Sequence, residues 1–162
     1  MTTTASKRRP MLIGAVIVAA LGLAVGGLVQ TGEGDFYQAL IKPDLNPPSY
    51  LFGIVWPILY LLIGAAVGRV WAEKGHPLRG RALFWFAIQF ALNLAWTPTF
   101  FGLELIQVAL GVITALIVAA IATTFYFGRI DRVAPWLMVP YLAWITFAAI
   151  LNLRIIQLNP GF

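Results

Sequence analysis

The chain has 162 residues, of which 60% are hydrophobic and only 10% are charged, and its formal net charge is +5. A soluble domain carries about 25% charged residues, so this composition excludes an ordinary soluble globular protein. The sequence contains no cysteine, which excludes disulfide bonds and thiolate metal sites.

Five apolar runs follow one another along the chain, each close to the length of about 20 residues that a membrane-spanning helix needs. They predict an all-α membrane protein, a single domain built as a bundle of five transmembrane helices in the lipid bilayer. The predicted helices cover residues 11–29, 50–71, 82–101, 105–127 and 135–158. The first run is longer than the apolar part of a signal peptide, so we interpret it as a retained helix. A proline-rich polar loop, residues 30–49, separates the first two helices and is expected to act as a lid.

The basic residues indicate an orientation in the membrane. Of the 11 Lys and Arg residues, only Lys42 and Arg154 fall on the side of the bilayer that holds the loop 30–49. The positive-inside rule therefore predicts a cytoplasmic N-terminus if the protein lies in an inner membrane. This distribution explains the positive charge without a nucleic-acid partner, and we predict none.

Aromatic side chains recur along one face of the second predicted helix. Phe52, Trp56 and Tyr60 are four residues apart and therefore share that face. The fifth predicted helix carries a similar set at spacings of three and four, namely Tyr141, Trp144, Ala148 and Leu151. Such stripes either pack inside a bundle or line a ligand pocket, and the spacing leaves both readings open.

The third predicted helix combines two amides with a tryptophan, Gln89, Asn93 and Trp96, on one face. A polar group in hydrocarbon needs a partner, so the two amides are expected to face the interior of the bundle. They would either form hydrogen bonds between helices or orient a ligand in an apolar pocket.

Prolines and small residues mark further positions inside the helices. Pro57, Pro98 and Pro140 each lack the donor for the carbonyl four residues earlier, which either opens a gap for a ligand or simply reflects the frequency of proline in membrane helices. Small residues at four-residue spacing predict close helix contacts within the monomer or a dimer face. These small residues are Gly22, Gly26, Gly64, Gly68, Gly111, Ala115 and Ala119.

Residues that could carry catalysis are hard to find in this sequence. No carboxylate lies in the middle of an apolar run, and the single histidine, His76, lies in a basic connection. The chain shows no metal-ligand cluster and no nucleophile–base pair, so we predict no catalytic residue, no metal and no bound cofactor. A metal-free tetrapyrrole needs only an apolar slot with aromatic walls.

Three ordered blocks resemble the TspO/MBR family, the tryptophan-rich sensory proteins and translocator proteins that include the peripheral-type benzodiazepine receptor. The blocks are FYQALIKPDLNPPSYLFGIVWPILY, QFALNLAWTPTFF and PYLAWITFAAILNLR. The chain departs from the family pattern at Phe36 and Leu45, where tryptophan is common, and at Leu153, where a steroid-binding motif has tyrosine. We therefore do not predict strong cholesterol binding through that motif.

The resemblance implies a homodimer whose pocket lies under the first loop and binds porphyrins such as protoporphyrin IX, or other hydrophobic ligands. The protein would serve as a receptor, transport its ligand, or regulate tetrapyrrole and stress responses. Together with the stripes, the resemblance gives as ligand-binding candidates Phe52, Trp56, Tyr60, Asn93, Trp96, Tyr141, Trp144, Ala148 and Leu151.

Two alternative functions stay open on the sequence. Light-dependent porphyrin breakdown would use Trp56 and Trp144 as redox partners. A small-solute channel or carrier would need a continuous polar path, for which Gln89 and Asn93 are the obvious candidates.

Overall fold

The computed structural model describes residues 4–28 and 34–161, and these residues contain helices but no strand. The prediction of an all-α fold is therefore confirmed for this part of the chain. In chain order the helices are α1 (Thr4–Leu28), α2 (Asp35–Ala39), α3 (Ser49–Ala72), α4 (Arg79–Thr97), the π-helix η1 (Pro98–Gly102), α5 (Ile106–Ile130) and α6 (Ala134–Leu158).

The observed helices differ from the five predicted ones in number and in bounds. The short helix α2 lies within the predicted loop 30–49, and α1 begins at Thr4 rather than at residue 11. The predicted helix 82–101 is divided, because α4 ends at Thr97 and a π-helical turn continues it. Residues 29–33, which the predictions divided between a helix and the lid loop, lie outside the described residues.

Four of the described helices, α1, α3, α5 and α6, are long and apolar enough to cross a membrane. The fifth long helix, α4, does not reach this hydropathy, because it carries Arg81, Gln89 and Asn93. The predicted count of five membrane-spanning helices is therefore not confirmed by length and composition.

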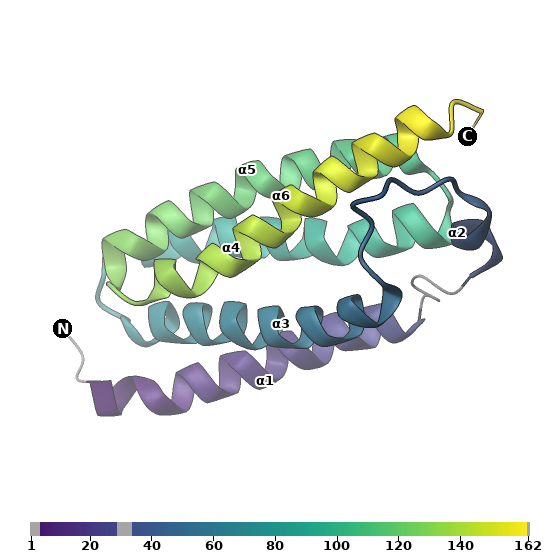
Figure 1. The fold of residues 1–162 in the computed structure, drawn as a ribbon. Helices are drawn as coiled ribbons and strands as arrows, with labels where there is room; N and C mark the ends of the chain where they lie inside the picture. Colours follow the sequence, from purple (N-terminus) through teal and green to yellow (C-terminus); the bar gives the residue numbers. More distant parts are fainter. Residues whose placement is uncertain (1–3, 29–33, 162) are drawn as a thin grey trace.

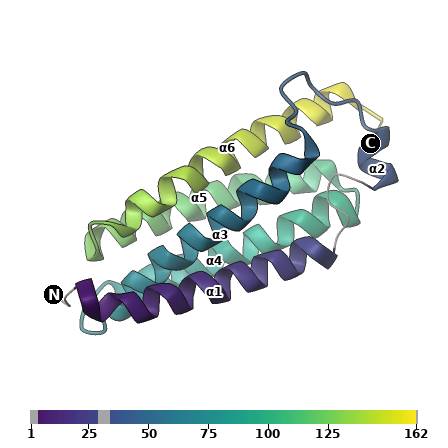
Figure 2. The same cartoon turned by 60° about the horizontal axis from the view of Figure 1, so that its bottom comes forward.

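The five long helices run side by side along one direction, so the molecule has two distinct ends (Figure 1). One end, here called the basic end, holds the start of α1 and the connections 73–78 and 131–133. The other, the lid end, holds residues 34–48, η1 and the C-terminus. A second view shows α1 running along α3 on one side, with α6 on the other side of α3 (Figure 2).

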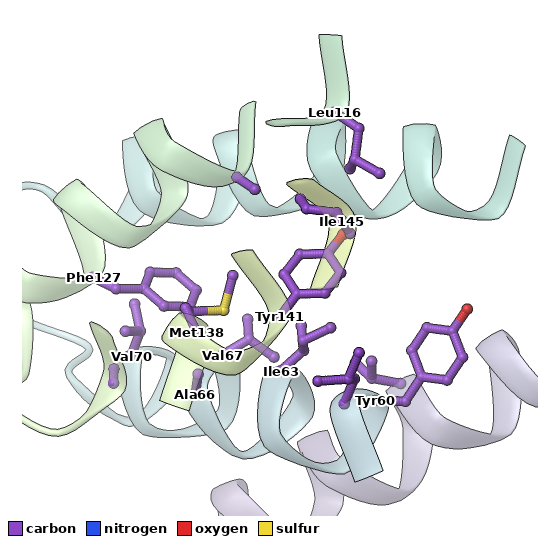
Figure 3. Packing of buried hydrophobic residues seen from close by; sticks show 14 of the residues in the cluster. Tyr60, Ile63, Ala66, Val67, Val70, Leu116, Phe127, Met138, Tyr141 and Ile145 are labelled. Atoms are coloured by element: carbon purple, nitrogen blue, oxygen red, sulfur yellow. The ribbon is translucent and has the colours of Figure 1, made fainter. Parts of the chain in front are cut away.

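The apolar core lies between α3, α5 and α6 (Figure 3). Ile63, Phe127, Met138 and Tyr141 are all fully buried there. Burial of such side chains is worth about 1.5–3 kcal/mol each relative to water, although lipid weakens this driving force between membrane helices. Shape complementarity therefore matters more than hydrophobicity in holding these helices together.

Glycines allow α1 and α3 to approach each other closely. A Cβ atom added to Gly64 would collide with the backbone of Gly14 and Ala15, and one added to Gly68 would collide with the backbone of Pro10 and Met11. The predicted small-residue pair Gly64 and Gly68 is thus a packing seam within the monomer. No side chain larger than hydrogen fits at either position without moving α1.

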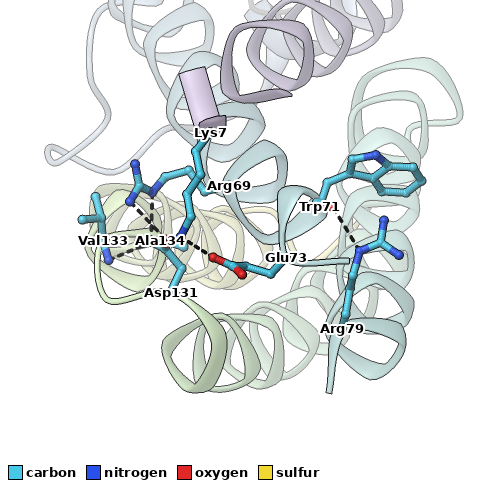
Figure 4. A network of polar contacts seen from close by, with 8 residues as sticks. All are labelled: Lys7, Arg69, Trp71, Glu73, Arg79, Asp131, Val133 and Ala134. Carbon is cyan, nitrogen blue, oxygen red and sulfur yellow. Dashed lines mark hydrogen bonds and ion pairs between the residues drawn. The ribbon is translucent and has the colours of Figure 1, made fainter. Parts of the chain in front are cut away.

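An ionic network ties α1 to the rest of the basic end (Figure 4). Lys7 pairs with Glu73 at 2.6 Å and with Asp131 at 2.7 Å, and Arg69 pairs with Asp131 at 2.9 Å. Asp131 also accepts the backbone N–H groups of Val133 and Ala134, both at 2.9 Å, so it caps the start of α6. Burial alone would raise the pKa of Asp131, but these hydrogen bonds outweigh burial and hold it below its ordinary value.

Candidate functional site

The aromatic stripe of α3 lines a cavity of about 300 Å³ at the lid half of the bundle. Phe52, Trp56 and Tyr60 all contribute to its wall, as their four-residue spacing indicates. The rings of Trp56 and Tyr60 stack with their centroids 5.3 Å apart. This arrangement presents aromatic surface to whatever occupies the cavity.

The opposite walls of this cavity come from α1 and from the α4–η1 junction. Trp96 and Phe101 face the stripe from the junction, and their rings meet edge to face with centroids 6.0 Å apart. Pro98 has no backbone N–H, so it cannot donate a hydrogen bond to the carbonyl four residues earlier. Its own carbonyl accepts a hydrogen bond of 2.8 Å from Leu103 N–H, five residues later, which is the spacing of a π-helix. This π-helical turn, a feature frequent at functional sites, positions Phe101 beside Trp96.

Glycines of α1 form the remaining side of the cavity. Gly22 is packed against the ring of Tyr60, so any side chain there would collide with that ring. Gly26 also lines the cavity, but a Cβ atom added to it would have no neighbour within 4 Å. Sequence reasoning identified these glycines only as a packing pair, and their four-residue spacing was the available signal.

A chain of hydrogen bonds links α3, α4 and α6 beside the cavity. Tyr60 OH donates to Asn93 Oδ1 at 3.0 Å, Asn93 Nδ2 donates to Tyr141 OH at 3.2 Å, and Tyr141 OH donates to Gln89 Oε1 at 2.8 Å. Gln89 and Asn93 are 0% and 3% exposed, which confirms that both amides face the interior of the bundle. In this structure they serve the interhelical hydrogen bonding that was one of their two predicted roles.

A second, smaller hollow of about 30 Å³ lies under the segment 34–48. Ala148 and Leu151 of α6 line it together with Tyr37 and Asn46, whose side chains form a hydrogen bond of 2.9 Å. It shares the side chains Phe52, Trp96 and Phe101 with the larger cavity. The two hollows therefore adjoin each other under the lid segment.

Asn159 fastens the lid segment to the end of α6. Its side chain accepts a hydrogen bond from Ile41 N–H and donates one to the Ile41 carbonyl, both at 2.9 Å. The Asn159 amide thus pairs with both backbone polar groups of Ile41, as one strand pairs with its neighbour in a sheet. These two bonds hold the lid segment over the smaller hollow.

Trp144 lies apart from the cavity that contains Trp56. It lines a groove of about 450 Å³ between α3 and α6, and its ring meets the ring of Phe52 with centroids 5.8 Å apart. Phe52 therefore separates the two tryptophans, which open into different hollows. Tyr141, fully buried, and Asn93 line neither the cavity nor the smaller hollow.

Comparisons with known proteins match most of this chain to one family. The sequence model of the TspO/MBR family matches residues 14–158. The chain belongs to the TspO/MBR family. With four apolar helices of spanning length, it is an integral membrane protein.

Relatives in this family come from bacteria, archaea and mammals. The chain is 39% identical to the tryptophan-rich protein TspO of Chlorobaculum tepidum over 145 residues, which cover 87% of this chain and 90% of that protein. It is 36% identical to the translocator protein of Homo sapiens over 155 residues, or 93% and 90% of the two chains. It is also 36% identical to the protein CrtK of Rhodobacter capsulatus over 129 residues, or 79% and 81%.

In this TspO/MBR protein, two indole N–H groups in the described part of the chain are buried without a hydrogen-bond partner. They belong to Trp96, which lines both adjoining hollows, and to Trp144, which lines the outer groove. Buried donors are normally satisfied, so these two unpaired indole N–H groups stand out among the buried polar groups of the bundle. Sequence reasoning named both tryptophans but not this property, which depends on the surroundings of each ring.

Proposed function

We propose that this protein binds a flat, aromatic amphiphile of the tetrapyrrole class, such as protoporphyrin IX, in the cavity between α1, α3 and the α4–η1 junction. The observation that carries the proposal is the aromatic wall of this cavity, which includes Trp96, whose buried indole N–H has no hydrogen-bond partner among the described residues. Pockets for such ligands are mostly apolar and contain a small number of placed polar groups.

Each wall of the cavity would meet a different part of the ligand. The faces of Trp56 and Tyr60 offer stacking surface, which suits a planar conjugated ring. Trp96 Nε1 is a donor only, so it would bond to a carboxylate or carbonyl oxygen at the edge of that ring. Asn93 is less suited to this role, because both ends of its amide are already bonded within the bundle.

The membrane arrangement that goes with this proposal is a single domain with five spans, in which α4 also crosses the bilayer. Its polar residues Gln89 and Asn93 are buried inside the bundle rather than exposed to lipid. The segment 34–48 would then lie opposite the basic end, which would face the cytoplasm. Exposed Gly111 and Ala115 on α5 favour a homodimer, because small residues let helices from two copies approach closely.

The biological outcome of binding would be reception or transfer of the tetrapyrrole, or regulation of a response to it. The lid segment and the cavity lie at the same end of the bundle, so a ligand would enter or leave there. We propose no chemical step on the ligand, since Trp56 and Trp144 open into different hollows.

The test is a titration of protoporphyrin IX with the detergent-solubilised protein in the dark, followed by the shift of the Soret absorbance band. Trp96→Phe keeps a ring but removes the donor, and it should weaken binding by roughly three- to tenfold, the equivalent of about 0.7–1.4 kcal/mol. Trp136→Phe is the matched control, because Trp136 is 74% exposed at the start of α6 near the basic end. Unchanged affinity in Trp96→Phe, or equal weakening in both variants, would overturn the assignment of the cavity.

A further inference from the structure

A second apolar groove lies at the basic end of the molecule, away from the aromatic cavity. It has a volume of about 380 Å³ and runs over α3 between α1 and α4. Ile13, Gly14 and Ile17 form its α1 side, Trp71 closes it toward the basic end, and Phe86 of α4 forms the far wall. It shares no residue with the aromatic cavity, and its volume is in the range of small-molecule sites, about 300–1,000 Å³.

The mouth of this groove carries a positive charge. The Arg79 guanidinium lies over the Trp71 ring, 4.5 Å from its centroid, and Arg79 Nε donates a hydrogen bond of 3.1 Å to the Trp71 carbonyl (Figure 4). Only one of the five N–H groups of the guanidinium is used in that bond, so the others can meet an anion. The stacking fixes the cation beside the apolar groove rather than leaving it free in solvent.

The acidic residues of the basic end are already engaged elsewhere. Glu73 and Asp131 are the only acids in the connections of this end, and both pair with the buried network of Lys7 and Arg69. Neither of these two acids therefore competes with an external anion for Arg79. The apolar groove and the cation at its mouth together match a molecule with a long apolar chain and an anionic head.

We propose that this basic-end groove binds an anionic phospholipid, with one acyl chain along Ile13, Ile17 and Phe86 and with the lipid phosphate paired with Arg79. Trp71 is 54% exposed and lies between the two parts of the site, at the level where indole rings favour the boundary between headgroups and hydrocarbon. Basic pockets between membrane helices are known binding sites for anionic headgroups.

The test is native mass spectrometry of the full-length protein in neutral detergent, titrated with phosphatidylglycerol or with phosphatidylcholine of the same acyl chains. The protein should retain phosphatidylglycerol more strongly. Arg79→Gln should weaken that binding about fivefold, the equivalent of about 1 kcal/mol for one basic residue near the surface, and leave phosphatidylcholine binding unchanged. Equal affinity for the two lipids would overturn the proposal.

The matched control is Arg129→Gln. Arg129 lies at the same end and stacks on Phe125 at 4.9 Å, yet neither residue lines the groove. It should leave phosphatidylglycerol binding unchanged, and a loss equal to that of Arg79→Gln would show a general effect of surface charge instead. Added inorganic phosphate should not displace the lipid, whereas displacement would show that the arginine alone forms the site.

A groove-filling variant tests the acyl-chain part of the proposal. Ile13 is 58% exposed, so Ile13→Trp can fill the groove from α1 without disturbing the core, and it should abolish the preferential retention of phosphatidylglycerol. Unchanged retention of phosphatidylglycerol would overturn the proposal. The proposal would also be overturned if the wild type showed the mass of a dimer and Ile13→Trp did not, because the groove would then bind a second copy of the chain. If this variant fails to fold, the fluorescence of Trp71 can be measured with phosphatidylglycerol that carries brominated chains, which quench a nearby indole. The signal of Trp71 is obtained by comparison with Trp71→Phe. Absence of quenching of Trp71 would exclude the site.

Discussion

Tyr60 donates a hydrogen bond to Asn93 across the interface of α3 and α4, while the ring of the same tyrosine forms part of the cavity wall. The hydroxyl and the ring of Tyr60 thus have separate roles. The hydroxyl fixes the orientation of the side chain through an amide that is itself held by Tyr141, and the ring provides the surface for stacking. The cavity wall is thus connected by hydrogen bonds to the core behind it.

Removal of that hydroxyl should loosen the bundle without removing the wall. Tyr60→Phe keeps the ring but leaves the Asn93 oxygen without its partner, so the free energy of unfolding should fall by about 1 kcal/mol. Thermal unfolding in detergent, followed by circular dichroism, measures the change. Tyr50→Phe is the control, since Tyr50 is 65% exposed and should tolerate the same change. Equal melting temperatures for wild type and Tyr60→Phe would show that the hydrogen-bond chain contributes nothing.

A glycine packed in the seam between α1 and α3 and an open glycine of α4 should respond to alanine with opposite signs. Gly68→Ala places a methyl group against the backbone of Pro10 and Met11, so α1 must move and stability should fall by about 1–3 kcal/mol. Gly80→Ala in α4 meets no atom within 4 Å and should raise stability by about 0.5–1 kcal/mol, because alanine favours a helix. Unfolding midpoints measured in the same detergent check both signs, and a tolerated Gly68→Ala would contradict the close packing.

The basic-end network should make stability depend on pH. The pKa of Asp131 is lower in the folded protein than the ordinary value of 3.8, so its contribution is fully present above 3.8 and is lost progressively as the pH falls from there through the lower folded-state pKa. Asp131→Asn should destabilise the protein by about 3 kcal/mol at pH 7, because Lys7 and Arg69 lose a buried partner. The difference from wild type should begin to shrink below about pH 4, because the carboxylate then becomes protonated in the unfolded chain while it stays ionised in the folded protein.

Unfolding measured at pH 7 and at pH 3.5 checks this expectation. The control is Asp44→Asn, because Asp44 lies exposed in the lid segment and forms no part of the network. A gap between wild type and Asp131→Asn that stays constant with pH would rule out the carboxylate charge as its source.

The sequence predicted helix faces well and the relations between helices poorly. Four-residue spacing correctly put Phe52, Trp56 and Tyr60 on one face, because that periodicity is local to a single helix. The same reasoning could not show that Trp144 opens into a different groove, since this depends on the rotation of α6 relative to α3. Whether any of these residues binds a ligand stays a prediction.

The sequence also could not predict features that depend on contacts between residues far apart in the chain. Lys7 and Asp131 are 124 residues apart, and nothing in the spacing of charges pairs them. Pro98 did indicate a lost backbone bond in the third predicted helix, but not that the chain would continue as a π-helix. In this turn Phe100 and Phe101 pack against Trp96, an arrangement of rings that the spacing of residues alone does not specify.

Gly26 offers a way to close the cavity without disturbing the bundle. Gly26→Leu projects a side chain into space where a Cβ atom would have no neighbour within 4 Å, so it should occupy ligand volume rather than displace protein. Leucine also favours a helix more than glycine does, so the melting temperature should not fall. We expect the affinity for protoporphyrin IX to drop at least about tenfold, the equivalent of about 1.4 kcal/mol, in the Soret titration.

Gly80→Leu is the matched control for this cavity-filling change. Gly80 is exposed on α4, where an added Cβ atom likewise has no neighbour within 4 Å, and it does not line the cavity. The two variants add the same atoms to helices of the same bundle, so only the position relative to the cavity differs. Weaker porphyrin binding in Gly26→Leu alone would support the cavity as the binding site. Unchanged binding in Gly26→Leu would contradict the cavity as the binding site, and the groove lined by Trp144 would be the next candidate to test.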